Sequence, residues 1–282
     1  MNYNVLSLGA GVQSSAMALM AMHGEITPKP DFAIFSDTQA EPDSIYKWVD
    51  YLESKLDYPL IRVTAGNLTD ATLSPAYRTK DTAGGKKGSS YMPKLIPMFG
   101  KSPTGEKQAS LGRACTKDFK INPIFKEIKR YYGVKPRSQK QAITQWVGIS
   151  YDEIQRMRED PKPWLKNRYP LIELNMHRWH CKEWMKKNGY PEPPRSACYY
   201  CPFHSDDEWR HLRNNDPKFF KKAIEYDKAL REKFKEHDSH FKMEVYLHRS
   251  CEPLGEINFD NEIDKGQLDF DFQSECQGMC GV

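Results

Sequence analysis

Short apolar runs alternate with helical patterns along the N-terminal part of the chain. Residues 3–8 and 32–36 are short apolar runs, and the apolar stretch 14–23 between them is long enough for a helix. Residues 43–56 carry apolar side chains on one helical face, and residues 59–63 repeat the strand pattern. Because strands that alternate with helices pair in parallel, this order predicts an α/β fold: a doubly wound parallel sheet with helices on both faces.

Two later segments continue the same pattern. Residues 118–132 predict a helix, and residues 143–149, rich in β-branched and aromatic side chains, predict a further central strand. We therefore expect the α/β domain to cover residues 1–160.

The remainder of the chain has a different character. Ser205 and Glu208 form a capping box, and residues 216–237 form a charged amphipathic helix that opens with Asp-Pro. We expect a smaller helical, cysteine-containing C-terminal subdomain with a tail over residues 161–282.

A basic segment interrupts the α/β pattern at residues 78–113. It contains eight lysines and arginines, two acidic residues and six glycines. Long glycine-rich loops are either functional or simply solvated. The segment therefore predicts a mobile basic lid or, equally, an insertion without a role of its own.

Composition narrows the class of protein. The 282 residues carry a net charge of +4, which permits a nucleic-acid partner without requiring one. No apolar run of about 18 residues and no basic-then-apolar leader is present, so we expect a cytoplasmic protein rather than a membrane or secreted one. In such a protein, seven cysteines indicate metal or redox chemistry rather than a disulfide framework.

The turn between the first strand and the first helix is the strongest candidate for a ligand site. Glycines allow the backbone to approach a ligand closely, and the amides and dipole at a helix start favour an anion. The turn therefore predicts a phosphate site. Its candidate ligands are Ser7, Gly9, Gly11, Ser14 and Ser15.

Other polar residues are expected at the same edge of the sheet. Asp37 and Thr38 follow the second strand, and Gly148 and Asp152 lie at and beyond the end of the strand at 143–149. Ligands of open α/β sheets lie outside the carboxyl ends of the strands. We therefore expect these residues to face the same crevice as the glycine turn.

Five segments, taken in order, resemble the superfamily of PP-loop ATP pyrophosphatases and 3′-phosphoadenylylsulfate (PAPS) reductases. Residues 9–14 are similar to its S-G-G-x-D-S loop, with Gln13 at the aspartate position, and residues 35–42 to its D-T-G-x-x-x-P segment, with Gln39 at the glycine. Residues 147–153 resemble its G-h-R-x-D-E-S segment, with Ser150 at the arginine. The other two matches are R-x-C-T-x-x-x-K at Arg113 to Lys120, and Y-P-L, a tryptophan and C-x-x-C-P over 169–202.

The resemblance implies an adenine nucleotide alpha hydrolase-like fold and roles for particular residues. It implies that Gln13, Asp37, Thr38, Arg113 and Asp152 join the loop in binding ATP or PAPS, with Mg²⁺ accompanying ATP. Developing negative charge would be offset by Lys117 or Lys120.

A metal centre is predicted from the cysteines. Cys198 and Cys201 have a spacing that both zinc and iron–sulfur sites use. Cys115 and Cys276 are the preferred additional ligands, and resemblance to the iron–sulfur branches of the superfamily favours a 4Fe–4S cluster. Zinc is the alternative, completed by two of His177, His180, Cys181, His204 and His211. Apart from that alternative, Cys181 and Cys251 are expected in the core, because free cysteine behaves as a small buried hydrophobe.

Two reactions fit the resemblance. An acceptor oxygen, such as one on a nucleic acid, could attack the α-phosphorus of ATP and release pyrophosphate before sulfur insertion, for which a sulfur-donor protein is a possible partner. Alternatively a thiolate, with Cys280 as the candidate, could attack the sulfur of PAPS. Gln13 favours the second reaction, because PAPS reductases often have glutamine there. A non-catalytic nucleotide sensor with a zinc-stabilised module that binds nucleic acid or protein is a third possibility.

Overall fold

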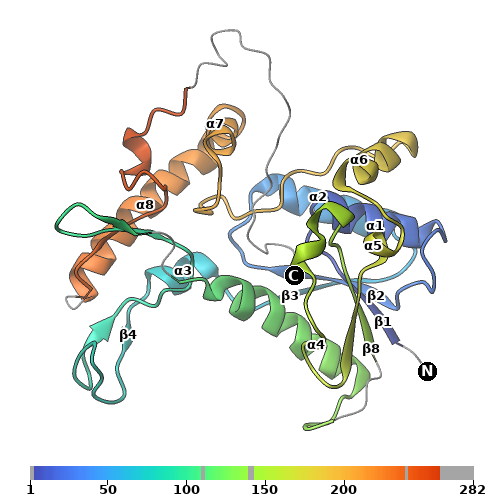
Figure 1. The fold of residues 1–282 in the computed structure, drawn as a ribbon, viewed down its shortest axis with the longest axis horizontal. Coiled ribbons are helices and arrows are strands. Elements are labelled where there is room, and N and C mark those ends of the chain that lie inside the picture. Colours follow the sequence, from blue (N-terminus) through green and yellow to red (C-terminus); the bar gives the residue numbers. More distant parts are fainter. Residues whose placement is uncertain (1–2, 109–111, 139–142, 239–240, 261–282) are drawn as a thin grey trace. The chain divides into compact units, whose positions relative to one another are not determined.

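The computed structural model describes residues 3–108, 112–138, 143–238 and 241–260 (Figure 1). Within these ranges the chain forms two compact units. The first contains residues up to 65 and residues 116–197, and the second contains residues 66–115 and the described residues from 198 onward. Cys276 and Cys280 lie outside the described residues.

A five-stranded parallel sheet forms the centre of the first unit. Its order is β3-β2-β1-β8-β9, and every neighbouring pair is parallel. The strands are β1 Tyr3–Ser7, β2 Phe32–Asp37, β3 Leu60–Thr64, β8 Ile143–Val147 and β9 Leu165–Arg168. The chain winds outward from β1 in both directions, which confirms the predicted doubly wound α/β fold.

One face of this sheet is covered by α1 Val12–Met22, α2 Asp43–Lys55 and α6 Arg178–Lys187. Successive residues of a strand point to opposite faces, so Leu6 and Trp146 lie in the same core as Met17 of α1 and Met185 of α6. All four side chains are almost completely buried. This core explains why α1 is apolar around most of its circumference.

The other face is covered by α4 Asn122–Tyr132. Ile124 and Ile128 of this helix pack with Val5 and Ile34, the strand residues of opposite parity. A π-helical segment, η1 Thr116–Ile121, precedes α4, and Ser36 Oγ donates a hydrogen bond of 2.7 Å to the carbonyl of Phe119. The helix predicted at 118–132 is therefore present in two parts.

The boundary of the first unit differs from the predicted one near residue 160. β9, the short α5 Pro170–Glu173 and α6 all follow residue 160 in sequence, yet they belong to the first unit. The reason is that β9 pairs with β8, and α6 contributes Cys181 and Met185 to the core on α1. Basic and aromatic residues dominate the sequence of α6, so its two core positions do not stand out.

The second unit is built around α8 Pro217–His237, the helix predicted at 216–237. α7 Asp206–Asn215 precedes it, and the predicted capping box between Ser205 and Glu208 is confirmed. α3 Leu68–Leu73 packs on α8, and β10 Glu244–Tyr246 extends a small antiparallel sheet with β6 Phe99–Lys101 and β7 Lys107–Gln108. A short 3-10 turn, η3 Leu254–Glu256, follows β10. No helix among the described residues is long and apolar enough to cross a membrane.

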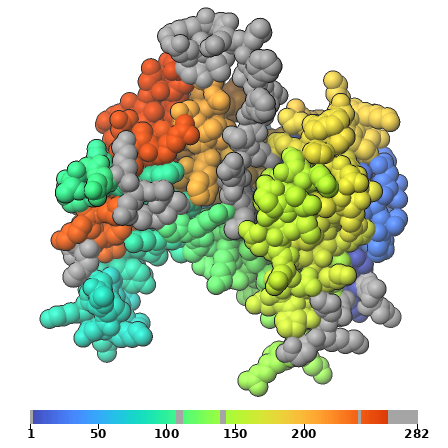
Figure 2. Space-filling model, viewed as in Figure 1, coloured from blue at the N-terminus to red at the C-terminus, as the bar shows by residue number. Residues whose placement is uncertain are grey.

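The basic segment at 78–113 is not a structureless lid in its described part. β4 Ala76–Tyr77 pairs with β5 Ser90–Tyr91 in a hairpin, and β6 pairs with β10 of the same unit. Met92, Ile96 and Met98 are buried, and these three side chains anchor the segment. Figure 2 shows the hairpin, in cyan and teal, as a protruding lobe of the second unit.

Candidate functional site

The turn from β1 into α1 has the geometry of an anion site. Ala10 adopts a left-handed backbone with φ of 59°, and Gly11 caps the helix in an extended conformation. The Gly9 N–H donates a hydrogen bond of 3.1 Å to Ser14 Oγ, which closes the turn. The strained residue is therefore Ala10 rather than either glycine. A left-handed non-glycine residue costs free energy and is typical of turns at functional sites.

The start of α1 is buried, with Ala10 and Val12 among the enclosed residues, but it has no anionic side chain of its own. Among the described residues no side chain caps this helix, and its first turn contains no acidic residue. The first intrahelical hydrogen bond runs from Ser15 N to Gly11 O at 3.0 Å. The amides before Ser15, together with the positive end of the helix dipole, favour a phosphate group.

This turn lies at the point where the strand order of the sheet reverses. β1 and β8 are neighbours, and the chain passes from β1 to β2 on one side of the sheet and from β8 to β9 on the other. A Cβ atom on Gly148, just after β8, would lie 3.0 Å from both the N and Cα atoms of Ser14. Gly148 is therefore required for the close contact between the two loops. Ligands of open α/β sheets bind at such a reversal point.

Two of the predicted phosphate ligands have hydroxyl groups already engaged below the turn. Ser7 Oγ accepts a hydrogen bond of 2.6 Å from Gln145 Nε2. Ser15 is fully buried, and its Oγ accepts a hydrogen bond of 2.9 Å from Trp48 Nε1 of α2. Both serines fix the turn against the sheet and α2, whereas Ser14 places its hydroxyl within the turn itself.

Gln13 connects the turn to the loop after β8. Its Nε2 atom lies 3.3 Å from Glu153 Oε2 and 3.5 Å from Ser150 Oγ. Glu153 belongs to η2 Tyr151–Arg156 and also forms an ion pair with Arg156. The carboxamide of Gln13 therefore donates to a carboxylate.

The loop after β2 is held by Asp37. Its Oδ1 accepts hydrogen bonds from Gln39 N at 2.7 Å and from the Tyr46 hydroxyl at 2.9 Å. Burial, reinforced by Asp37, raises the pKa of Tyr46, so the phenol stays protonated and donates. Gln39 has a φ of 58°, the left-handed conformation that glycine adopts most easily. The turn is therefore glycine-like although glutamine occupies the position.

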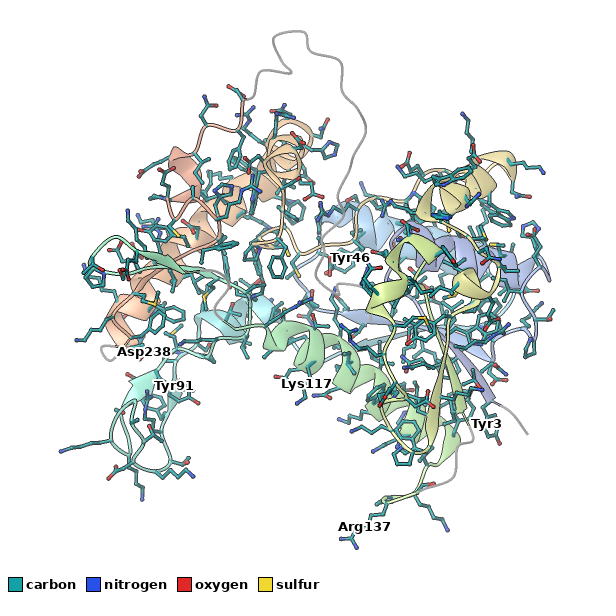
Figure 3. The ribbon with its side chains drawn as sticks, viewed as in Figure 1. Tyr3, Tyr46, Tyr91, Lys117, Arg137 and Asp238 are labelled. Atoms are coloured by element: carbon teal, nitrogen blue, oxygen red, sulfur yellow. The ribbon has the colours of Figure 1, made fainter. Side chains whose placement is uncertain are left out.

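The two predicted catalytic lysines have different surroundings. Lys120 Nζ lies 3.5 Å from Glu41 Oε1, and that same oxygen lies 3.4 Å from Thr38 Oγ1. Glu41 and Thr38 are both buried, so Lys120 is linked to the loop after β2. Lys117 is exposed on η1 (Figure 3).

Residues that the sequence analysis did not single out complete the surroundings of the turn. Ser196 Oγ donates a short hydrogen bond to the carbonyl of Gly9. Arg178 N, at the start of α6, donates a hydrogen bond of 3.0 Å to Asp152 Oδ1. The proline-rich stretch before Arg195 and Ser196 indicates a rigid extended segment in the sequence. The sequence does not indicate that this segment reaches the turn after β1.

Three of the predicted metal ligands lie in the second unit. Cys198 and Cys201 share one turn, in which Cys201 N donates a hydrogen bond of 2.9 Å to Cys198 O. Burial raises the pKa of the Tyr226 phenol, with smaller contributions from Cys198 and Cys115. Tyr200 stacks on Tyr226, with ring centroids 4.0 Å apart.

Within the described residues, no three His, Cys, Asp or Glu side chains are arranged to hold a metal ion. Cys276, the predicted fourth ligand, and Cys280, the predicted nucleophile, are outside the described ranges. Arg113, a predicted nucleotide ligand, belongs to the second unit, where its guanidinium lies 5.4 Å from the ring centroid of Phe203.

The alternative zinc ligands are divided between the two units. His177, His180 and Cys181 belong to the first unit, and His204 and His211 belong to the second. His180 Nδ1 accepts the His177 N–H at 3.0 Å and so caps α6. Burial raises the pKa of the Cys181 thiol to about 12. Cys181 and Cys251 are both buried, which confirms their expected place in the core.

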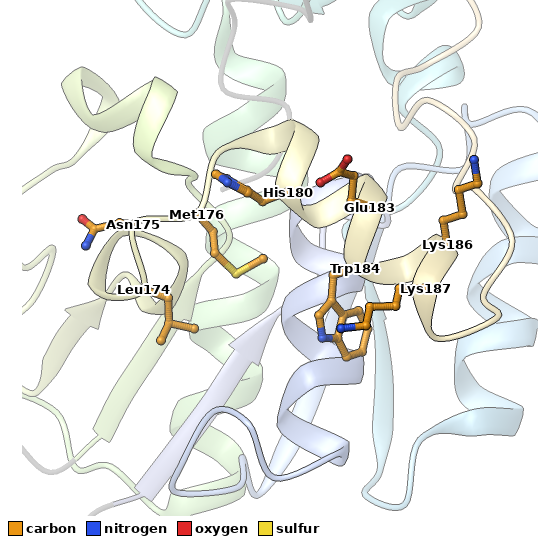
Figure 4. Close-up of a pocket in the computed structure, with 8 residues that line it drawn as sticks. All are labelled: Leu174, Asn175, Met176, His180, Glu183, Trp184, Lys186 and Lys187. Atoms are coloured by element: carbon orange, nitrogen blue, oxygen red, sulfur yellow. The ribbon is translucent and has the colours of Figure 1, made fainter.

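An open groove of about 720 Å³ lies along α6 (Figure 4). Trp184, Met176 and His180 line it together with Lys186 and Lys187. His180 is already used as a helix cap, and none of the predicted nucleotide ligands lines the groove. The groove is therefore separate from the turn after β1.

Comparison with known proteins yields little. No protein-family model matches the chain, and no curated protein matches it. Among solved structures it is similar to the U34-tRNA thiolase NcsA from Methanococcus maripaludis with its 4Fe–4S cluster. The match covers 81% of this chain and 72% of the thiolase chain, with 12% sequence identity and a TM-score of 0.32.

Proposed function

We propose that the chain is an enzyme of the PP-loop and PAPS-reductase superfamily that uses an adenylyl nucleotide, ATP or PAPS, in sulfur chemistry. The observation that carries this proposal is the turn after β1. It combines a left-handed Ala10 and an uncapped α1 with a position at the strand-order reversal, next to Gly148. This combination suits a phosphate chain. The family motifs after β2 and β8 favour an adenylyl nucleotide as the molecule that carries this phosphate chain.

Adenylyl transfer from ATP to a nucleic acid is the first candidate reaction. An acceptor oxygen would attack the α-phosphorus, pyrophosphate would leave, and a sulfur nucleophile would then displace AMP. The β4–β5 hairpin favours a nucleic-acid acceptor, because it carries the exposed lysines Lys80, Lys86 and Lys87 and also Tyr77, which is 65% exposed. Exposed cations and an exposed aromatic ring on one hairpin suit a single strand, whose phosphates and bases they can bind.

Reduction of PAPS is the second candidate reaction. A thiolate would attack the sulfonate sulfur and release adenosine 3′,5′-bisphosphate, and a second thiol would then release sulfite by forming a disulfide. Gln13 favours this route through the family resemblance, and the proposed nucleophile is Cys280. Both candidate reactions use the turn after β1, which would bind ATP in the first reaction and PAPS in the second.

We further propose that Cys115, Cys198 and Cys201 bind a metal centre, with Cys276 as the fourth ligand. The shared turn of Cys198 and Cys201 supports this assignment, although the three described cysteines are not arranged to hold an ion in this structure. Thiolate ligands suit a 4Fe–4S cluster, with zinc as the alternative. A bound cluster would supply an iron site for handling sulfide, and zinc would supply structural support.

The experiment that tests the function compares two products from anaerobically purified protein. Pyrophosphate release from labelled ATP, with RNA or DNA as acceptor, would support adenylyl transfer. Sulfite release from PAPS with a thiol reductant would support reduction. Ser14→Ala should diminish whichever activity is found. Absence of both products with every acceptor would contradict an enzymatic role and favour a nucleotide-sensing module.

A further inference from the structure

Exposed hydrophobic side chains are concentrated in one stretch of the first unit. Seven large hydrophobic side chains are exposed among the described residues, and five of them fall between residues 151 and 179. These five are Tyr151, Ile154, Met157, Leu174 and Trp179. Single exposed side chains of this kind are ordinary, whereas several together mark an interaction site. The stretch from η2 to the start of α6 is therefore a candidate interaction surface.

Four aromatic rings form a continuous row on this surface. The ring centroids of Tyr151 and His177 lie 5.4 Å apart, and those of His177 and His180 lie 5.5 Å apart. The Trp179 ring lies against His180, with centroids 3.6 Å apart. Trp179 is 54% exposed and Tyr151 is 41% exposed, so both ends of the row are accessible.

The row is held in place by backbone contacts. Tyr151 N donates a hydrogen bond of 2.7 Å to the carbonyl of Met176, which ties η2 to the segment before α6. His180 Nδ1 accepts the N–H of His177 and fixes these two rings at the start of the helix. A row of rings that is already ordered loses little conformational freedom when a ligand binds.

The groove along α6 continues the row. His180 belongs to the row and also lines the groove, which Trp184 lines farther along the helix (Figure 4). The Trp184 ring is fixed, because its Nε1 atom donates a hydrogen bond of 2.8 Å to Glu25 Oε2 and the ring stacks on Tyr190. The row and the groove therefore form one aromatic surface of the first unit.

Positive charge accompanies these rings. Residues 174–189 contain four lysines and arginines and one acidic residue. Lys186 and Lys187 are exposed, and both line the groove together with Trp184. Rings combined with exposed cations suit a polyanion that has planar groups, and such a polyanion is a nucleic acid with unpaired bases.

One end of the row adjoins the proposed nucleotide site. Tyr151 directly follows Ser150, whose Oγ lies 3.5 Å from Gln13 Nε2 of the turn after β1. Tyr151, Ser150 and Gln13 all belong to the first unit. A chain that lies along the row from Trp179 to Tyr151 is therefore directed toward the turn.

We propose that the row from Tyr151 to Trp179 and the groove along α6 bind a single-stranded segment of the nucleic-acid acceptor. Its bases stack on the rings, and Lys186 and Lys187 bind its phosphates. The inference rests on the adenylyl-transfer candidate of the proposed function, since reduction of PAPS requires no nucleic acid. The surface belongs to the first unit, so its contribution is separable from that of the β4–β5 hairpin in the second.

The test measures binding of labelled single-stranded RNA and DNA oligonucleotides of mixed sequence to the full chain by fluorescence anisotropy. Trp179→Ala and Tyr151→Ala should each weaken binding by about tenfold, the effect of losing one stacked base. Trp179→Phe keeps a ring and should retain most of the affinity. Ile154→Ala is the matched control, because it removes an exposed side chain of the same stretch that has no ring.

Two further measurements distinguish binding from a structural role. Lys186→Gln with Lys187→Gln should lower the slope of log K against log salt by roughly 0.7 for each lost phosphate contact, which a structural change would not do. Trp179→Ala should bind ATP or PAPS as the wild type does, because Trp179 lies outside the turn. The duplex of the same sequence should bind more weakly, since its bases stack on one another.

The possible results separate this inference from the proposed function. Equal oligonucleotide binding by Trp179→Ala and the wild type would overturn the surface, as would equal binding of single strand and duplex. Equal losses in Ile154→Ala and Trp179→Ala would also overturn it, and would indicate an apolar patch for a protein partner. Wild-type protein that binds ATP or PAPS but no oligonucleotide would overturn the surface and leave the nucleotide function standing. Oligonucleotide binding that depends on Trp179, without binding of either nucleotide, would support the surface and overturn the proposed function.

Discussion

The Nε2 atom of Gln13 lies 3.3 Å from Glu153 Oε2 and joins the turn after β1 to the 3-10 segment after β8. Glu153 is mostly buried, with 16% of its side chain exposed. A neutral donor at position 13 satisfies this carboxylate, whereas a second carboxylate would repel it. The residue at position 13 therefore suits the loop that it contacts as well as the ligand that the turn would bind.

Gln13→Asp should destabilise the protein because it places two carboxylates against each other. We expect a loss of about 1–3 kcal/mol in the free energy of unfolding at pH 7, measured by denaturant titration. The double variant Gln13→Asp with Glu153→Gln should recover most of that loss. Equal stability of Gln13→Asp and the wild type would show that the contact is unimportant.

Gly148→Ala should disturb the turn because the new Cβ would lie 3.0 Å from backbone atoms of Ser14. We expect a destabilisation of about 1–3 kcal/mol, the usual range for overpacking, and weaker nucleotide binding. Gly11→Ala is the control, since its Cβ would lie 3.9 Å from Ser196 Cβ, an ordinary contact. Calorimetric binding and thermal melting measure both effects. A larger effect at Gly11 than at Gly148 would contradict this account of the turn.

Gln39 should tolerate glycine and reject a β-branched residue, because its backbone is left-handed. We expect Gln39→Gly to stay within about 1 kcal/mol of the wild type and Gln39→Val to lose about 1–2 kcal/mol, since valine is strained at positive φ. Denaturant unfolding measures both variants. If Gln39→Val proves as stable as Gln39→Gly, the turn after β2 is not left-handed in solution.

Cys198→Ala should remove the proposed metal. Anaerobically purified wild type should contain iron and sulfide with absorbance in the visible region, and the variant should contain neither. Cys251→Ala is the matched control, because Cys251 is a buried thiol of the same unit that lies 3.6 Å from the carbonyl of Gly100. Stoichiometric zinc without iron would replace the iron–sulfur assignment, and metal retained by Cys198→Ala would refute this residue as a ligand.

Lys86→Gln combined with Lys87→Gln should weaken binding of single-stranded RNA or DNA. Each lost phosphate contact should lower the slope of log K against log salt by roughly 0.7. The control is Lys221→Gln with Lys228→Gln, which removes two exposed lysines of α8, 80% and 70% exposed. Fluorescence anisotropy at several salt concentrations measures the effect. An equal effect of both double variants would indicate that binding depends on overall positive charge rather than on the hairpin.

Strong periodic patterns in the sequence predicted the central sheet and the long helix α8. β1, β2, β3 and β8 are short apolar runs, which are easy to recognise; β1, β2 and β8 are mostly buried, whereas β3 lies at the edge of the sheet and is partly exposed. β9 was missed because Leu165 is the only fully buried position among its four residues. The boundary between the two units was missed because the second unit joins two segments that are distant in sequence, 66–115 and 198 onward.

The phosphate turn could be located from sequence, but its supporting contacts could not. Trp48, Gln145 and Ser196 approach the turn from three different parts of the fold, and none of them belongs to a local motif.

Equilibrium titration of ATP and of PAPS into the wild-type protein and Ser14→Ala tests the central claim most directly. Ser14 is the suitable position because its hydroxyl lies within the turn, whereas that of Ser15 is engaged with Trp48. We predict saturable binding of at least one nucleotide at one site per chain, weakened by about tenfold in Ser14→Ala, which should stay folded although it loses the hydrogen bond from Gly9. Absence of binding by either nucleotide, or equal binding by Ser14→Ala, would contradict the assignment of this turn as the nucleotide site.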